Sequence, residues 1–131
     1  VSNLDGEYAG VLARRKIAMR AGETDRAVSV DPTPFEEIAR GIAQAIPHPG
    51  TIDVDVFVDE SGDCFVIDIN PRFGGGYPFS HLSGARVPSC YVAWALGRSE
   101  DPSWLRYDTQ VIAGKYVEIG STTEGSANAH A

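Results

Sequence analysis

The amino-acid sequence predicts an α+β fold, with helices packed on one face of a largely antiparallel sheet. Two strand-like runs, residues 51–58 and 64–70, are separated by a short turn, and a helix with clear end signals precedes them at residues 33–46. Strands joined by a short turn pair antiparallel, whereas parallel strands need a long crossover. A chain of 131 residues can bury one core. We therefore expect one domain over residues 1–120, followed by a small, polar tail at 121–131.

The N-terminal part of this domain contains turn signals and a basic run. Asp5-Gly6 is a typical hairpin turn, and the basic stretch that follows extends to Arg20. We expect residues 22–25 to form a loop and residues 27–30 to form a short strand.

Residues 33–46 carry the signals of an amphipathic helix. Thr33 is a favourable N-cap, Pro34 suits the first helical position, and Glu36 completes a capping box. Pro47 ends the helix. The apolar residues that recur at helical spacing form one stripe: Phe35, Ile38, Ala39, Ile42, Ala43 and Ile46. We interpret this helix as structural.

Two more elements are expected towards the C-terminus. A glycine-rich segment at residues 74–76 and a break at Ser83-Gly84 precede a helix-like run at 88–96. Residues 110–119 are predicted to form a final strand.

Alternation along the two central strands separates an acidic face from an apolar face. Successive side chains of a strand point to opposite sides of the sheet, so Asp53 and Asp55 share one face of the first strand, and Asp68 and Asn70 share one face of the second. A four-residue loop at 60–63 places Asp55 opposite Asp68 and Asp53 opposite Asn70, whereas a loop two residues shorter places Asp53 opposite Asp68. We expect the apolar residues of the other face to lie in the core: Ile52, Val54, Val56, Val58, Phe65, Ile67 and Ile69.

Two carboxylates that face each other across a strand pair need compensation. Their Cβ atoms lie about 4.5–5.5 Å apart, where like charges repel, so either one carboxyl is protonated or a cation lies between them. Oxygen ligands without His or Cys favour a hard ion, Mg²⁺ or Mn²⁺, which commonly takes phosphates as its remaining ligands. The alternative is a solvated strand face with exposed acids.

The residues after the second strand add a further cation. Pro71 stops the strand, so Arg72 emerges beside the proposed metal site, where a guanidinium can bind a phosphate or a carboxylate. The glycines at 74–76 either allow backbone N–H groups to approach an anion or allow a sharp bend.

The segment Asp-Ile-Asn-Pro-Arg-Phe-Gly-Gly-Gly-Tyr at residues 68–77 resembles the signature of the ATP-grasp superfamily. The segment Gly-Thr-Ile-Asp-Val-Asp-Val-Phe at 50–57 resembles the strand that supplies the first metal-binding acid of that superfamily. The resemblance covers about residues 5–97 and is strongest to proteins like the large subunit of carbamoyl phosphate synthase. It implies the C-terminal subdomain of the ATP-grasp fold, with ATP and Mg²⁺ (or Mn²⁺) as ligands. The N-terminal half of the enzyme would precede Val1.

The resemblance also implies roles for individual residues. Asp55 corresponds to the first metal ligand, Asp68 to the acid that bridges two ions, and Asn70 to a ligand of the second ion. Arg72 would bind phosphate or the acyl phosphate and act in catalysis. The superfamily usually has Glu or Gln at the position of Asp55 and Glu at that of Asp68, so the shorter side chains here would hold the ions nearer the backbone.

The basic run is the second candidate for function. In an extended strand Arg14, Lys16 and Arg20 share one face, a pattern that is also typical of an edge strand protected by charge. In ATP-grasp enzymes this part of the sheet faces the phosphates and the second substrate. The resemblance therefore implies that Arg14 and Arg20 bind the nucleotide and that Lys16 is catalytic.

The reaction implied by the resemblance is a two-step ligation. A small carboxylate would attack the γ-phosphate of ATP to give an acyl phosphate, from which an amine or ammonia would displace phosphate. We expect the isolated chain to bind divalent metal weakly and to have little ligase activity. Two other functions fit the residues: a non-catalytic binding or assembly domain derived from this fold, and a metal hydrolase that uses Asp53, Asp55 and Asp68 without ATP.

Charge and composition exclude some partners. The net charge of −7 disfavours non-specific binding to nucleic acid or to an anionic membrane, and no apolar run approaches the roughly 18 residues of a membrane helix. Cys64 and Cys90 form neither a disulfide framework nor a metal knuckle, so we expect a cytoplasmic protein. Self-association is possible through an exposed sheet edge.

Overall fold

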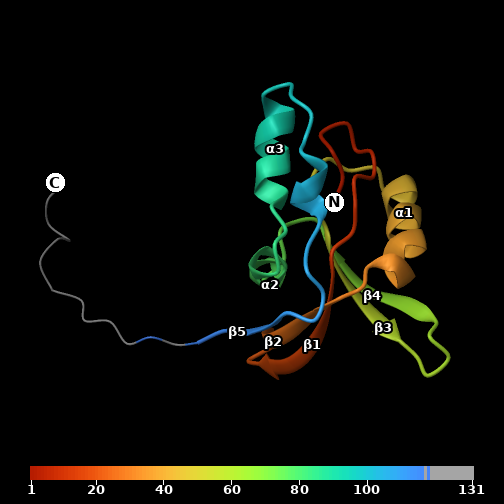
Figure 1. Cartoon of the computed structure of the whole chain (residues 1–131). Coiled ribbons are helices and arrows are strands. Elements are labelled where there is room, and N and C mark those ends of the chain that lie inside the picture. The colour runs from red at the N-terminus through yellow and green to blue at the C-terminus, as the bar shows by residue number, and fades with distance from the viewer. Residues whose placement is uncertain (117, 119–131) are drawn as a thin grey trace, which may run out of the picture.

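The computed structural model describes residues 1–116 and 118 and confirms the α+β class. All strand pairs are antiparallel, but the strands divide into two sheets (Figure 1). One sheet has the order β1-β2-β5 and the other contains β3 and β4. The strands are β1 (Ala13–Arg20), β2 (Glu23–Val30), β3 (Asp53–Val58), β4 (Cys64–Asn70) and β5 (Ile112–Gly114).

The helices lie on both sides of the N-terminal segment in Figure 1, with α1 beside the β3–β4 pair and α2 beside the three-stranded sheet, which it contacts. They are α1 (Glu36–Ala45), α2 (Tyr77–Leu82) and α3 (Val87–Ala95), with 3-10 turns η1 (Thr33–Phe35) and η2 (Pro102–Leu105). The most deeply buried apolar residues come from β2, α3 and the segment that joins α2 to α3: Ala27, Val28, Ala85, Val87 and Cys90. None of the helices in the described part of the chain has the length and apolar character needed to cross a bilayer.

The first hairpin is longer than the sequence predicted. Residues 23–25 belong to β2 rather than to a loop, and Arg20 pairs directly with Glu23. The turn consists of Ala21 and Gly22, which both have positive φ, of 50° and 81°. Two consecutive residues with positive φ match the twist of a two-residue hairpin, so the strand resumes at once.

The predicted capping box does not form. Asp31 intervenes: its Oδ1 accepts the backbone N–H of Thr33 at 3.0 Å and the hydroxyl of Thr33 at 2.8 Å. An Asp side chain can bind the backbone two residues ahead and compete with the helix cap. These bonds lower the pKa of Asp31 below its usual value. The helix therefore begins with η1, and α1 starts at Glu36 without a side-chain cap.

The C-terminal elements agree with the sequence only in part. The helix predicted at 88–96 is α3, whereas α2 was not predicted. The strand predicted at 110–119 is limited to β5, because Gln110 adopts a left-handed φ of 64° in a turn. Residues 117 and 119 of that prediction, and the predicted tail at 121–131, lie outside the described residues.

Candidate functional site

The β3–β4 pair places the acidic residues as the four-residue loop predicted. Asp55 lies directly opposite Asp68, and Asp53 lies opposite Asn70. Opposed residues of an antiparallel pair share a face of the sheet, so the two carboxylates of Asp55 and Asp68 project to the same side. The amide of Asn70 donates from Nδ2 to Oδ2 of Asp68 at 2.6 Å, which leaves its carbonyl oxygen as a possible ligand.

The apolar face predicted for the two strands is wrong between the Asp55–Asp68 pair and the hairpin loop. The register shifts between Asp55 and Val56, which pairs with Val66, so Ile67 becomes the extra residue of a β-bulge. Past the bulge Phe65 pairs with Phe57 and lies on the same side as the acids, and Ile67 is 68% exposed. The alternation of faces predicted from the sequence therefore holds at the base of the hairpin, and on β4 it is inverted between the bulge and the tip.

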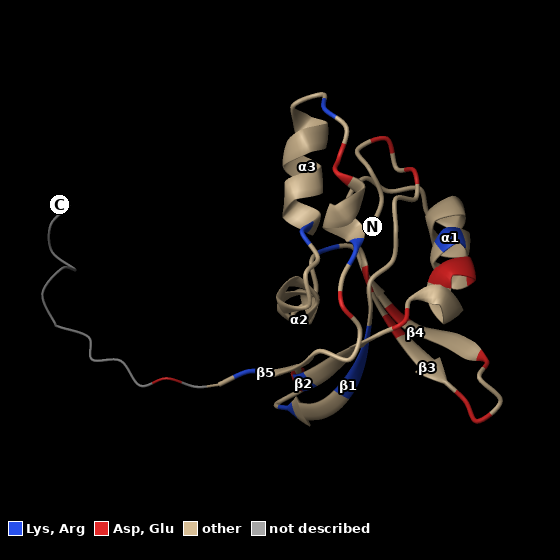
Figure 2. Ribbon diagram, in the orientation of Figure 1, with Lys and Arg blue, Asp and Glu red and all other residues tan. Residues whose placement is uncertain are grey.

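Strand β1 brings a basic row to the acidic row of β3. Arg14 donates from Nη2 to Oδ1 of Asp53, and Nζ of Lys16 lies 2.7 Å from Oδ2 of Asp55. In Figure 2 the blue stretch of β1 and the red residues of β3 and β4 mark these two rows. Side chains on one face of a strand recur every two residues. Arg14 and Lys16, two residues apart on β1, therefore meet Asp53 and Asp55, two residues apart on β3.

The two ion pairs differ in how far they are shielded from water. The side chains of Arg14 and Asp53 are 19% and 21% exposed, whereas those of Lys16 and Asp55 are both 41% exposed. Exposed ion pairs contribute little stability because water screens them. Replacing Lys16 by another cation beside Asp55 should therefore cost less free energy than replacing Arg14 beside Asp53.

The other two predicted cations lie apart from these pairs. Arg20, at the far end of β1, pairs with Asp25 of its own hairpin at 2.5 Å. Arg72 is exposed just after β4 and donates to the backbone oxygen of Phe73 at 3.2 Å. Neither contacts Asp55 or Asp68 in the structure, and their roles stay predictions.

The glycine-rich segment folds closely over the Arg14–Asp53 pair. Gly74 and Gly76 are buried. A Cβ atom at Gly74 would overlap the carboxylate of Asp53, and one at Gly76 would overlap the guanidinium of Arg14. Neither of these two glycines has a positive φ, so they are needed for close approach rather than for backbone freedom.

Aromatic packing holds the start of this segment in place. The ring of Phe73 contacts Tyr77 of α2 edge-on at 4.8 Å between centroids, and it contacts Tyr91 of α3 at 6.1 Å. The hydroxyl of Tyr91 in turn lies 2.8 Å from that of Thr51, just before β3. The glycine segment is thus fixed from both sides, by aromatic rings and by the ion pair.

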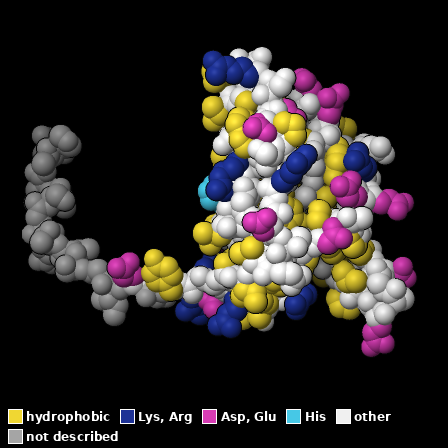
Figure 3. Space-filling model, in the orientation of Figure 1, with side chains coloured by type: hydrophobic (Ala, Val, Ile, Leu, Met, Phe, Trp, Pro, Cys, Tyr) yellow, Lys and Arg dark blue, Asp and Glu magenta, His cyan; other side chains and the backbone are white. Residues whose placement is uncertain are grey.

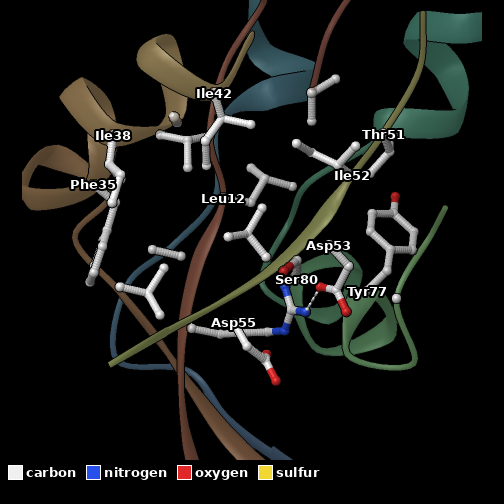
Figure 4. A pocket seen from close by; sticks show the side chains of 18 of the residues that line it. Leu12, Phe35, Ile38, Ile42, Thr51, Ile52, Asp53, Asp55, Tyr77 and Ser80 are labelled. Carbon is white, nitrogen blue, oxygen red and sulfur yellow. Dashed lines mark hydrogen bonds and ion pairs between the residues drawn. The ribbon is translucent and has the colours of Figure 1, made fainter. Parts of the chain in front are cut away.

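A cavity of about 720 Å³ lies between α1, β1 and β3, which is within the size range of small-molecule sites. Figure 4 shows Leu12, Ile38, Ile42 and Ile52 along its apolar part. Asp53 and Asp55 lie at its other end, where the dashed line marks the hydrogen bond that Arg14 donates to Asp53. The cavity therefore combines an apolar wall with a charged end.

The donor chemistry of the Asp55–Asp68 pair with Asn70 fits Mg²⁺ or Mn²⁺, and of these three residues Asp55 also lines the cavity. Asp55, Asp68 and Asn70 offer carboxylate and amide oxygens, and Mg²⁺ typically takes one or two carboxylates together with water and phosphate. Within residues 1–116 and 118, no three His, Cys, Asp or Glu side chains come together as a metal-binding group. The set is therefore limited to two carboxylates and one amide, and Lys16 already compensates Asp55.

Sequence reasoning missed the partner of Arg14 and the reason for the glycines. It assigned Arg14 to the nucleotide, and gave Asp53 a role only in the alternative of a metal hydrolase. A signal was present: Arg14 and Lys16 have the same spacing as Asp53 and Asp55, which is the pattern of two strands whose charged faces meet.

Comparison with known proteins identifies the family. No curated protein matches the chain. The family model described as "ATP-grasp in the biosynthetic pathway with Ter operon" matches residues 1–117, which include every element from β1 to β5. The chain therefore belongs to this ATP-grasp family and is an ATP-binding domain of the ligase type.

Proposed function

We propose that this chain provides the Mg·ATP site of a ligase that joins a small carboxylate to an amine or ammonia. The observation that carries the proposal is the pairing of Asp55 with Asp68 beside Asn70, because opposed carboxylates on one face of a strand pair are expected where a hard cation binds. Family membership supports ATP as the nucleotide. The identity of the two substrates rests on the resemblance to carbon–nitrogen ligases alone.

In this proposal Asp55, Asp68 and Asn70 hold the metal. Mg²⁺ (or Mn²⁺), when bound, supplies positive charge that offsets repulsion between the β- and γ-phosphates. Asp68 is exposed on the same face as Asp55, so the ligand oxygens are accessible from the solvent side. Asn70 donates to Asp68 and thereby holds that carboxylate in one orientation.

The basic residues would act on the nucleotide and the substrate carboxylate. When the metal binds Asp55, Lys16 would leave that carboxylate and bind a phosphate oxygen. The Lys16–Asp55 ion pair is only half shielded from water, so it can open. Arg72 would bind the acyl phosphate from the end of β4, and Arg20 would bind the nucleotide after release from Asp25. Most of the rate enhancement would come from positioning and charge neutralisation.

The reaction would proceed in two steps. An oxygen of the substrate carboxylate attacks the γ-phosphorus of ATP, so that the bond to the bridging oxygen breaks and ADP leaves. The nitrogen of the amine or ammonia then attacks the acyl carbon, phosphate leaves, and the nitrogen loses a proton. The chain's cations would hold the phosphate oxygens during both steps.

The test is Asp68→Asn in the full-length protein, with Asp63→Asn as the control. Asp63 is an exposed acid of the β3–β4 loop, so the control has the same change of charge on the same hairpin. We expect Asp68→Asn to weaken Mn²⁺ binding at least tenfold and to abolish carboxylate-dependent ATP hydrolysis, because a charged metal ligand is lost. Binding and turnover at the level of the control would contradict the proposal.

One observation favours a second function. Arg14 and Lys16 already neutralise Asp53 and Asp55, so the acids of β3 are compensated within the chain. A non-catalytic binding or assembly domain would need no more than this. In that case Asp68→Asn would change neither nucleotide binding nor any activity of the full-length protein.

Self-association and a cytoplasmic location also belong to the proposal. In the described part of the chain β3 and β4 pair only with each other, so both outer edges of this sheet are open. In a dimer, an open edge of this sheet would pair with an open edge of the second copy.

A further inference from the structure

The acid that lies next to the proposed metal ligands on β3 has a different environment from theirs. Oδ1 of Asp53 accepts from Arg14, and Oδ2 faces Gly74 so closely that a Cβ there would overlap it. Oδ1 of Asp53 is thus bound by Arg14, and Gly74 packs closely against the same carboxylate. Asp55 differs, since it is twice as exposed and carries only the ammonium group of Lys16.

Arg14 is enclosed in the same way. Its guanidinium is bound through Nη2 on one side and covered on another by Gly76, where a Cβ would overlap Nε and Nη2. The residue also lines the cavity. A guanidinium has several N–H groups in one plane, so fixing Nη2 against a carboxylate leaves the remaining groups in a defined orientation.

We propose that Asp53 is a positioning residue, which together with Gly74 and Gly76 holds Arg14 so that its free N–H groups present an anion site to the cavity. Asp53 is then not a metal ligand, although it is an acid on the same face as Asp55. In this proposal Gly74 and Gly76 pack against the ion pair, and their backbone N–H groups do not bind an anion. This inference rests on the proposed function, because the anion that Arg14 would receive is a phosphate of ATP.

Geometry supports a positioning role over a stabilising one. The Arg14–Asp53 pair is better shielded from water than the Lys16–Asp55 pair, and Gly74 and Gly76 approach its two partners closely. Arg is also the residue that binds phosphate with a planar, oriented fork. Preorganisation of such a group lowers the entropic cost of binding a ligand.

The test uses Asp53→Asn and Gly76→Ala in the full-length protein. Asp53→Asn keeps the shape of the side chain and removes its charge. Gly76→Ala displaces the guanidinium and leaves Asp53 unchanged. Two ligands are measured separately: Mn²⁺ alone, by electron paramagnetic resonance, and ATP with Mg²⁺, by calorimetry. Asp63→Asn again serves as the charge control.

We expect each variant to bind Mn²⁺ within about twofold of the wild type and to bind ATP about tenfold more weakly, as for the loss of one charge-assisted hydrogen bond. The double variant should be no weaker than either single variant, since both act on Arg14. Loss of fold would weaken both ligands together, so the split between them distinguishes positioning from simple destabilisation.

Four results would overturn the inference. If Asp53→Asn weakens Mn²⁺ binding tenfold, Asp53 is a metal ligand. If Asp53→Asn and Gly76→Ala bind ATP like the control, Arg14 needs no positioning. If Arg14→Ala binds ATP like the control, Arg14 presents no anion site, and the metal site of the proposed function remains intact. If the wild type binds neither ligand, the proposed function fails and the inference fails with it.

Discussion

Tyr107 joins the ends of β1 and β2 through one hydroxyl group. It donates to the backbone oxygen of Val30 at 2.7 Å and accepts the backbone N–H of Ala13 at 2.9 Å. Burial is the largest cause that raises the pKa of this phenol above its usual value. The neutral, donating form is therefore kept in the folded state, and its contribution is lost only as the pH rises above the ordinary value of 10.0.

Removing this hydroxyl should destabilise the chain. Tyr107→Phe leaves a backbone donor and a backbone acceptor without their partner, and each such loss costs about 1 kcal/mol or more. We expect the free energy of unfolding to fall by about 2 kcal/mol or more, measured by urea denaturation. Tyr116→Phe is the control, because Tyr116 is 84% exposed and should lose nothing. Equal stability of the two variants would show that Tyr107 does not join the strands.

The site residues show which parts of the fold can be predicted from sequence. The opposition of Asp55 and Asp68 follows from alternation and from the length of one loop, which are both local properties. The pairing of Arg14 with Asp53 joins residues 39 positions apart. Such a contact depends on how two sheets pack: the equal spacing of the charges on β1 and β3 is compatible with it, but does not determine which strands meet. The glycines at 74 and 76 could be explained only once that contact was known.

At the scale of elements, predictions failed where a single residue changed the backbone. The bulge at Ile67 inverts the faces of the hairpin tip, and Asp31 replaces the predicted cap of α1. In both cases the propensity of the element was read correctly. A local hydrogen bond or an extra residue then moved its boundary or its register.

The β3–β4 loop depends on Asp59, which gives it a pH dependence. Oδ1 of Asp59 accepts the backbone N–H groups of Ser61 and Asp63, both at 2.9 Å. The bond from Asp63 is the largest cause that lowers the pKa of Asp59 below its ordinary value of 3.8. A lowered pKa stabilises the fold above the ordinary value, and the contribution is lost as the pH falls through the lowered value.

We expect Asp59→Asn to have a lower melting temperature than the wild type at neutral pH, because an amide oxygen accepts less strongly than a carboxylate. The difference should shrink as the pH falls through the pKa of Asp59. Thermal unfolding followed by circular dichroism over this range tests it. The neighbouring variant Glu60→Gln should show no such convergence. A difference that is the same at all pH values would contradict the role of the ionised carboxylate.

At the scale of the whole molecule, the tip of the β3–β4 hairpin leaves apolar side chains in solvent. Phe57 is 57% exposed and its cross-strand partner Phe65 is 54% exposed, because the bulge moves Phe65 to the side of Phe57. Hydrophobic side chains are visible over this part of the surface in Figure 3. An open strand edge beside exposed aromatic residues favours pairing with another strand.

We predict that a second copy of the chain covers this hairpin, since an isologous contact would pair each open edge and each exposed aromatic residue with its own equivalent. We expect the wild type to form dimers in sedimentation velocity experiments, with a dimer fraction that rises with concentration. Phe57→Thr combined with Phe65→Thr should shift the protein to monomer and keep the strands, because Thr also favours β-structure. Val92→Thr removes apolar surface from α3, where Val92 is 61% exposed, and should leave the dimer unchanged. A wild type that stays monomeric, or a double Thr variant that still dimerises, would show that the hairpin does not mediate association.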